Sequence, residues 1–130
     1  MTKITIHNMH NHTAEEVFRA CLEPVFKRGT RAMDESKQIC TYVGGCAAGQ
    51  LLDKDEAERF DEYGSNWSWL TDEGLVPYIH RDVIGLAQSI HDNASSKLMK
   101  PPVLRAKEYC NEKGWSTDWL EQFDEDMVLE

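Results

Sequence analysis

The segment from Thr13 to Gly29 constrains the fold most, because it carries a complete set of helix signals. Thr13 and Glu16 have the spacing of a capping box, in which each side chain bonds the backbone N–H of the other residue at the start of a helix. Gly29 suits the position after the end of that helix. Between them, apolar side chains recur at the spacing of a helix with one buried face: Val17, Phe18, Cys21, Leu22, Val25 and Phe26. Other elements must cover this face, so the sequence predicts a packed domain.

A second capping box predicts a second, shorter helix. Asp53 and Glu56 repeat the spacing of the first box, which places a helix near residues 54–61. The next residues, 61–69, include Gly, Ser and Asn in succession and are expected to form a loop.

Prolines and small polar residues mark three more helices. Pro77 is expected to begin the strongest of them, and residues 101–102, both proline, to begin another that Gly114 ends. Ser116 is expected to cap the last one. Their apolar residues are Val83, Ile84, Ala87 and Ile90, then Val103, Ala106, Tyr109 and Cys110, then Trp119, Leu120 and Phe123.

Two short regions carry strand signals. Residues 4–6 alternate with polar neighbours, and residues 39–43 are β-branched and aromatic. Glycines 44–45 predict a tight turn, after which residues 46–52 form either a return strand or a small-residue turn leading into a helix. The predicted fold class is therefore α+β, mainly helical, with about five helices and a small β-hairpin.

The expected organisation is one globular domain with short polar ends. Residues 1–12 are predicted to be an N-terminal arm, residues 13–123 a single globular domain, and residues 124–130 a frayed acidic tail. No apolar run is long enough to span a membrane, and the N-terminus lacks the order of a signal peptide. We therefore expect a cytoplasmic protein, whose four cysteines are thiols.

Charge is distributed unevenly along the chain. The net charge is −9; residues 53–74 carry eight acidic and two basic side chains, and residues 115–130 carry six acidic and none that is basic. Such a field repels nucleic acid and favours basic protein partners, although the same charge also serves solubility alone. Residues 97–113 are locally basic, but the acidic regions around them oppose direct binding of nucleic acid.

Two tryptophans beside the first acidic stretch predict an interface, because tryptophan is enriched at binding hot spots. In an extended loop Trp67 and Trp69 would point the same way. The competing interpretation is that both rings cap the core. The predicted partner-binding face comprises Asp53, Asp55, Glu56, Glu58, Asp61, Glu62, Trp67 and Trp69.

Cysteines and histidines offer an alternative site. Cys40 and Cys46 flank the expected turn, and His80 and His91 are about three helical turns apart, on one face of the helix that Pro77 begins. Further histidines are His7, His10 and His12. Structural zinc sites usually have cysteines two to four residues apart, whereas five residues separate this pair. A catalytic thiol needs an adjacent base and a lowered pKa. We assign no catalytic residue, metal or cofactor.

The residues from Cys40 to Leu52 carry a resemblance. Their sequence, Cys-Thr-Tyr-Val-Gly-Gly-Cys-Ala-Ala-Gly-Gln-Leu-Leu, resembles a family of small proteins of tailed phages and prophages, with Cys-x-Tyr, a Gly turn and Cys-Ala-x-Gly-x-Leu-Ile. The order and spacing are loosely similar over residues 13–93. This chain has a shorter turn, and Val43 stands where the family often has arginine. The family has no established activity, so the resemblance carries over no catalytic residues; it implies a phage origin and an early, host-directed role.

Taken with the charge, the resemblance leads to a hypothesis about function. We expect a non-enzymatic phage accessory protein that binds and inhibits or modulates a host nucleic-acid-handling protein, as an anti-defence or host-takeover factor such as an anti-CRISPR. The basic groove of such a target, built for phosphate, would receive the carboxylates. No direct nucleic-acid or membrane contact is expected, and the oligomeric state stays open. The alternatives are a small metal- or thiol-dependent enzyme and a structural virion component.

Overall fold

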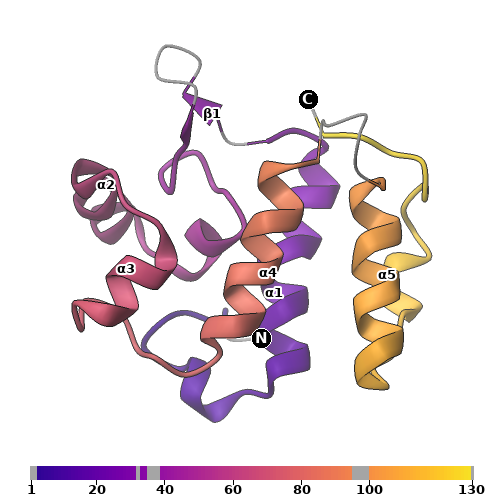
Figure 1. The fold of residues 1–130 in the computed structure, drawn as a ribbon, viewed down its shortest axis with the longest axis horizontal. Coiled ribbons are helices and arrows are strands. Elements are labelled where there is room, and N and C mark those ends of the chain that lie inside the picture. Colours follow the sequence, from indigo (N-terminus) through magenta and orange to yellow (C-terminus); the bar gives the residue numbers. More distant parts are fainter. Residues whose placement is uncertain (1–2, 32, 35–38, 95–99, 130) are drawn as a thin grey trace.

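A computed structural model describes residues 3–31, 33–34, 39–94 and 100–129 of the chain. The described residues contain five α-helices: α1 (Ala14–Arg28), α2 (Lys54–Tyr63), α3 (Trp67–Asp72), α4 (Arg81–Asp92) and α5 (Pro102–Lys113). They also contain the short 3-10 helices η1 (Met9–Asn11), η2 (Ala48–Leu51) and η3 (Asp118–Leu120). Figure 1 shows α4 lying across α1, with α5 on one side of this pair and α2 and α3 on the other.

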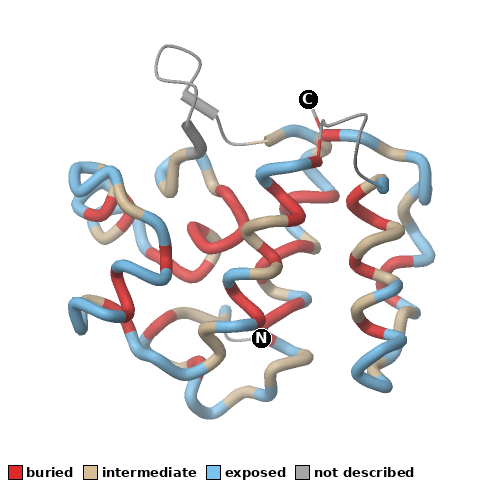
Figure 2. Tube along the Cα trace, in the orientation of Figure 1, coloured by how far each residue is buried: buried red, intermediate tan, exposed pale blue. Residues whose placement is uncertain are grey.

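Helix α1 is the central element, and its predicted signals are confirmed. The Thr13 Oγ1 atom accepts from the backbone N–H of Glu16 at 3.1 Å, and the Glu16 carboxylate accepts from the N–H of Thr13 at 2.9 Å. Gly29 ends the helix in the left-handed conformation, with φ 79°. All six residues of the apolar stripe are buried, and α1 packs against α4 and η2 (Figure 2). Burial of this stripe is the main source of the core, which runs through the middle of the molecule.

The predicted strand at residues 4–6 is wrong, because this backbone forms a local turn and bonds η2 instead. The N–H of Ile6 donates to the carbonyl of Leu51 at 3.0 Å. The carbonyl of Thr5 accepts from the N–H groups of Asn8 and Met9, and the Asn8 side chain accepts from the N–H of Thr5. Ile6 and Met9 are buried in the core. The start of the described chain is thereby fixed to the body of the protein.

The predicted β-hairpin around glycines 44–45 is also wrong, and the class is all-α rather than α+β. Residues 41–47 form turns, and η2 follows them. The N–H groups of Tyr42 and Val43, which a strand would use for pairing, bond the carboxylate of Asp61 at 2.8 and 3.1 Å. Strand pairing among the described residues is limited to two residues on each side, β1 (Met33–Asp34) with β2 (Ile39–Cys40). This ladder is too short to form a layer.

The boundary between α2 and α3 differs from the prediction. The capping box of Asp53 and Glu56 starts α2 as expected, but the predicted loop at 61–69 is wrong, because α2 continues to Tyr63 and α3 begins at Trp67. A short turn suffices, since Gly64 adopts φ 63° and the Asn66 side chain caps α3 by accepting from the Trp69 N–H at 2.9 Å.

Of the three later helices, only α5 follows its predicted signals at both ends. Helix α4 begins at Arg81 instead of Pro77, because His80 before it is left-handed, with φ 64°. Helix α5 runs from Pro102 to Lys113 and ends at Gly114, as predicted. The last predicted helix is only the single 3-10 turn η3.

The end of the described chain is anchored, whereas the acidic composition predicts a frayed tail. Leu129 is fully buried, and its N–H donates to the carbonyl of Ala94 at 3.3 Å. Lys107 on α5 pairs with Glu125 at 2.8 Å and with Glu121 at 3.5 Å. Among the described residues, no helix is long and apolar enough to cross a lipid bilayer.

Candidate partner-binding face

Half of the predicted acidic face has a structural role within the fold. Asp53 caps α2, and Glu56 completes the capping box and pairs with His7 at 2.7 Å. Asp61 holds the backbone of residues 42–43 in place. Each of these three carboxylates accepts at least one hydrogen bond within the fold, so each is less free to bind a partner than its charge suggests.

The other three carboxylates form a continuous exposed row. Asp55, Glu58 and Glu62 lie at relative positions i, i+3 and i+7 of α2, which share one face of a helix, and all three are exposed. We call them the acidic row. Arg59, whose guanidinium lies 4.8 Å from the centre of the Phe60 ring, borders the row and reduces its net charge.

The two tryptophans point in different directions, so the prediction that both face the same way is wrong. They lie on helix α3 rather than in an extended loop, and residues two apart on a helix project from nearly opposite sides. Trp67 is buried and packs edge-on against Tyr42, with ring centroids 6.4 Å apart. Trp69 is 38% exposed.

An exposed aromatic partner of Trp69 was missed from the sequence. Tyr63, at the last position of α2, is 47% exposed, and its ring centroid lies 5.5 Å from that of Trp69. We call Tyr63 and Trp69 the aromatic pair. It bridges α2 and α3 next to the acidic row. Both rings lie within residues 61–69, which were predicted to be a loop, so there was no helical spacing from which their contact could be predicted.

Another exposed aromatic side chain lies in the loop between α3 and α4. Tyr78 is 65% exposed. Arg81 holds it, donating to the Tyr78 hydroxyl at 3.0 Å and placing its guanidinium 5.0 Å from the ring centre. The same arginine pairs with Asp72 at 3.2 Å, which fixes the loop to the end of α3.

The members of the alternative thiol and histidine site that the structure describes are buried or bonded within the fold. The Cys46 side chain is buried, and burial raises the pKa of its thiol to about 12, the opposite of what a nucleophile needs. His80 donates to the carbonyl of Met9 at 2.9 Å. His91, at the other end of α4, is fully buried and bonds Asp92 at 2.9 Å. The Cys40 side chain lies outside the part that is described.

Metal ligands are likewise dispersed. Within the described ranges, no group of three or more His, Cys, Asp or Glu side chains is arranged to hold a metal ion. Of the N-terminal histidines, His7 pairs with Glu56, and His12 lies 3.5 Å from Glu16. These contacts fix the N-terminal residues to α2 and α1.

Burial gives a direct prediction for the thiols. Burial raises the pKa of the Cys46 thiol, so little of it is ionised near neutral pH, and the protein surface covers the side chain. Burial also raises the pKa of Cys21. We expect iodoacetamide to leave both unmodified in the folded protein and to modify both in guanidinium chloride, as measured by peptide mass spectrometry. Native-state alkylation of Cys46 at the rate of a free thiol would contradict this structure and revive the enzyme alternative.

Comparison with protein-family models, with curated proteins and with solved structures gave no match. The resemblance to the tailed-phage family therefore stays a prediction, and the functional interpretation rests on the residues of this chain.

Proposed function

We propose that this chain is a non-enzymatic binding protein that docks its α2–α3 face onto a basic surface of a nucleic-acid-handling protein and modulates that protein. The observation that carries the proposal is the aromatic pair, exposed beside the acidic row. A large exposed ring is costly in water and gains free energy when a partner covers it. The neighbouring carboxylates favour a partner whose surface is positively charged.

Each part of the face has a separate role in this proposal. The acidic row attracts and orients a basic surface, an effect that acts mainly on the association rate and weakens as salt screens it. The aromatic pair supplies apolar contact at the centre, where binding energy concentrates. A surface that normally holds phosphate has the basic character that the row requires. The resemblance to phage proteins implies that the partner is a protein of the bacterial host.

We expect Trp69→Ala to weaken binding by about 2 kcal/mol or more, as for a hot-spot tryptophan. Neutralising the row with Asp55→Asn, Glu58→Gln and Glu62→Gln together should cost about 1–3 kcal/mol at low salt, because each exposed pair contributes up to about 1 kcal/mol. The loss should shrink as salt rises. The partner is first captured from a bacterial lysate on the tagged protein, then purified, and its affinity for each variant is measured by calorimetry.

A matched control separates local charge from net charge. Asp118→Asn, Glu121→Gln and Asp126→Asn remove the same number of charges from exposed positions near the other end of the chain. We expect this control to bind the partner as the wild type does. A partner that responds equally to both triple variants, or that ignores Trp69→Ala, would refute docking through the α2–α3 face.

A further inference from the structure

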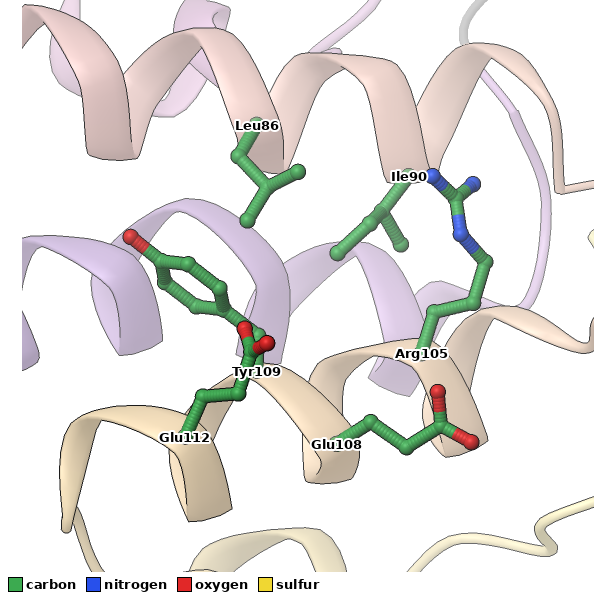
Figure 3. Close-up of a pocket in the computed structure, with 6 residues that line it drawn as sticks. All are labelled: Leu86, Ile90, Arg105, Glu108, Tyr109 and Glu112. Carbon is green, nitrogen blue, oxygen red and sulfur yellow. The ribbon is translucent and has the colours of Figure 1, made fainter.

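An open pocket of about 250 Å³ lies between α4 and α5 (Figure 3), apart from the α2–α3 face (Figure 1). Leu86 and Ile90 line it from α4. The α5 residues that line it are spaced i, i+3, i+4 and i+7, so one face of that helix is turned into the pocket: Arg105, Glu108, Tyr109 and Glu112. An apolar floor beneath a few polar groups is the usual composition of a small-molecule site, and the volume suits a ligand smaller than a drug.

The walls of the pocket are held by the core. Ile90 is buried and Leu86 is half-buried. The Tyr109 ring packs against Phe18 and Trp115, with centroid distances of 5.1 and 5.5 Å. Lys113 covers the same ring, its Nζ atom 5.7 Å from the centroid. A ligand would therefore find the apolar surface already formed, which lowers the cost of binding.

The guanidinium of Arg105 lies at one end of the pocket (Figure 3). Its Nη1 atom is closed off from solvent and has no hydrogen-bond partner in the described part of the chain. Glu108, the nearest acidic residue along α5, is paired with Lys100 at 2.8 Å instead. A guanidinium suits a carboxylate in both charge and geometry, so this end of the pocket favours an anion.

The opposite end has the reverse character. Figure 3 places the Tyr109 hydroxyl at the other side of the pocket from the Arg105 guanidinium, with Leu86 between them. Glu112 lines the pocket near this end, and burial, then the charges of Asp82 and Glu112, raise the pKa of Tyr109. Arg105 and Glu112 are seven residues apart, or about 10 Å along the helix axis. This end favours a cation.

We propose that the pocket binds a small aliphatic zwitterion. Its carboxylate accepts from Arg105, its chain lies on Leu86 and Ile90, and its ammonium group lies between Glu112 and the Tyr109 hydroxyl. A diamine would place a cation against the guanidinium, and a dicarboxylate would place an anion against Glu112. A neutral hydrocarbon would pair with neither charged end of the pocket.

Three probes of equal length test this assignment: 6-aminohexanoate, hexanoate and hexylamine. Binding is followed by amide chemical shifts in an NMR titration of the whole protein. We expect 6-aminohexanoate to give saturable shifts in residues 86–90 and 105–112. Each single-charge probe should bind about tenfold more weakly, since each lacks one charge-assisted contact. Equal affinity for all three probes, or no saturable shift with any of them, would overturn the proposal.

Variants assign the two ends of the ligand. Arg105→Gln should weaken 6-aminohexanoate about tenfold and leave hexylamine unchanged, and Glu112→Gln should weaken it similarly and leave hexanoate unchanged. Arg59→Gln, the same change on exposed α2, is the matched control and should bind all probes as the wild type does. Circular dichroism and the melting temperature verify folding of each variant. Unchanged 6-aminohexanoate affinity in a folded Arg105→Gln protein contradicts the assignment.

Discussion

Phe18→Ala should lower the free energy of unfolding by about 3–5 kcal/mol, the usual loss for a buried phenylalanine that leaves a cavity. Phe18 is fully buried on α1. Its ring centroid lies 5.1 Å from that of Tyr109, 6.0 Å from that of Trp115 and 6.4 Å from that of Trp119. Removing the ring therefore takes away a large part of the apolar contact between α1 and the segment formed by α5 and η3.

The loss is measured by urea unfolding, followed by tryptophan fluorescence and far-UV circular dichroism. Tyr78→Ala is the control, because it also removes a ring, but one that is largely exposed. It should change stability by less than about 1 kcal/mol. A similarly small loss for Phe18→Ala would mean that the aromatic cluster is not packed as described. A folded Phe18→Ala protein should also bind ligands less well in the α4–α5 pocket, since Phe18 supports the Tyr109 wall.

Gly49→Ala should destabilise the fold by about 1–3 kcal/mol, which is the cost of adding a group to a packed interior. A Cβ atom at Gly49 would lie 2.6 Å from the carbonyl oxygen of Tyr42 and 3.1 Å from its Cα. These are backbone atoms, so no side-chain rotation relieves the clash. Tyr42 is also bonded to Asp61 and to Ser65, which limits how far the backbone can move.

The matched control is Gly85→Ala on α4. Gly85 is exposed in mid-helix, and a Cβ atom there would meet nothing within 4 Å. Alanine should therefore stabilise the protein by about 0.5–1 kcal/mol through its better helix propensity. The two substitutions add the same methyl group, and their opposite signs are read from the midpoints of thermal or urea unfolding. The same sign at both positions would contradict the close approach of η2 to Tyr42.

Local signals predicted the elements that are stabilised locally. The capping boxes at Thr13 and Asp53 formed as expected, because each closes within one turn and needs no distant partner. The hairpin prediction failed for the opposite reason. Residues 39–43 have strand propensity, but the backbone at Tyr42 is bonded by Asp61, nineteen positions away. No local pattern reveals such a bond, and long-range contacts regularly override β propensity.

The same distinction applies to the predicted partner-binding face. Counting acidic residues identified the stretch at 53–62, but not which carboxylates the fold itself uses. Asp53 was identifiable as a cap from its spacing, whereas the bonds of Asp61 to residues 42–43 depend on the three-dimensional fold. In a loop, Trp67 and Trp69 would point the same way, whereas on the short helix α3 they point in nearly opposite directions.

The central place of α1 affects how the chain folds while it is being synthesised. The apolar stripe of α1 is complete by residue 28. Of the elements that cover it, η2 follows early, but α4 begins only at Arg81, and Trp115 and Trp119 come near the end. Contacts of such long sequence separation form late and slow the folding reaction. Until α4 has emerged, this stripe lacks much of its native cover, and a nascent chain in that state is prone to aggregate. Expression of the full chain should therefore depend on chaperones that hold nascent apolar segments more than its small size suggests.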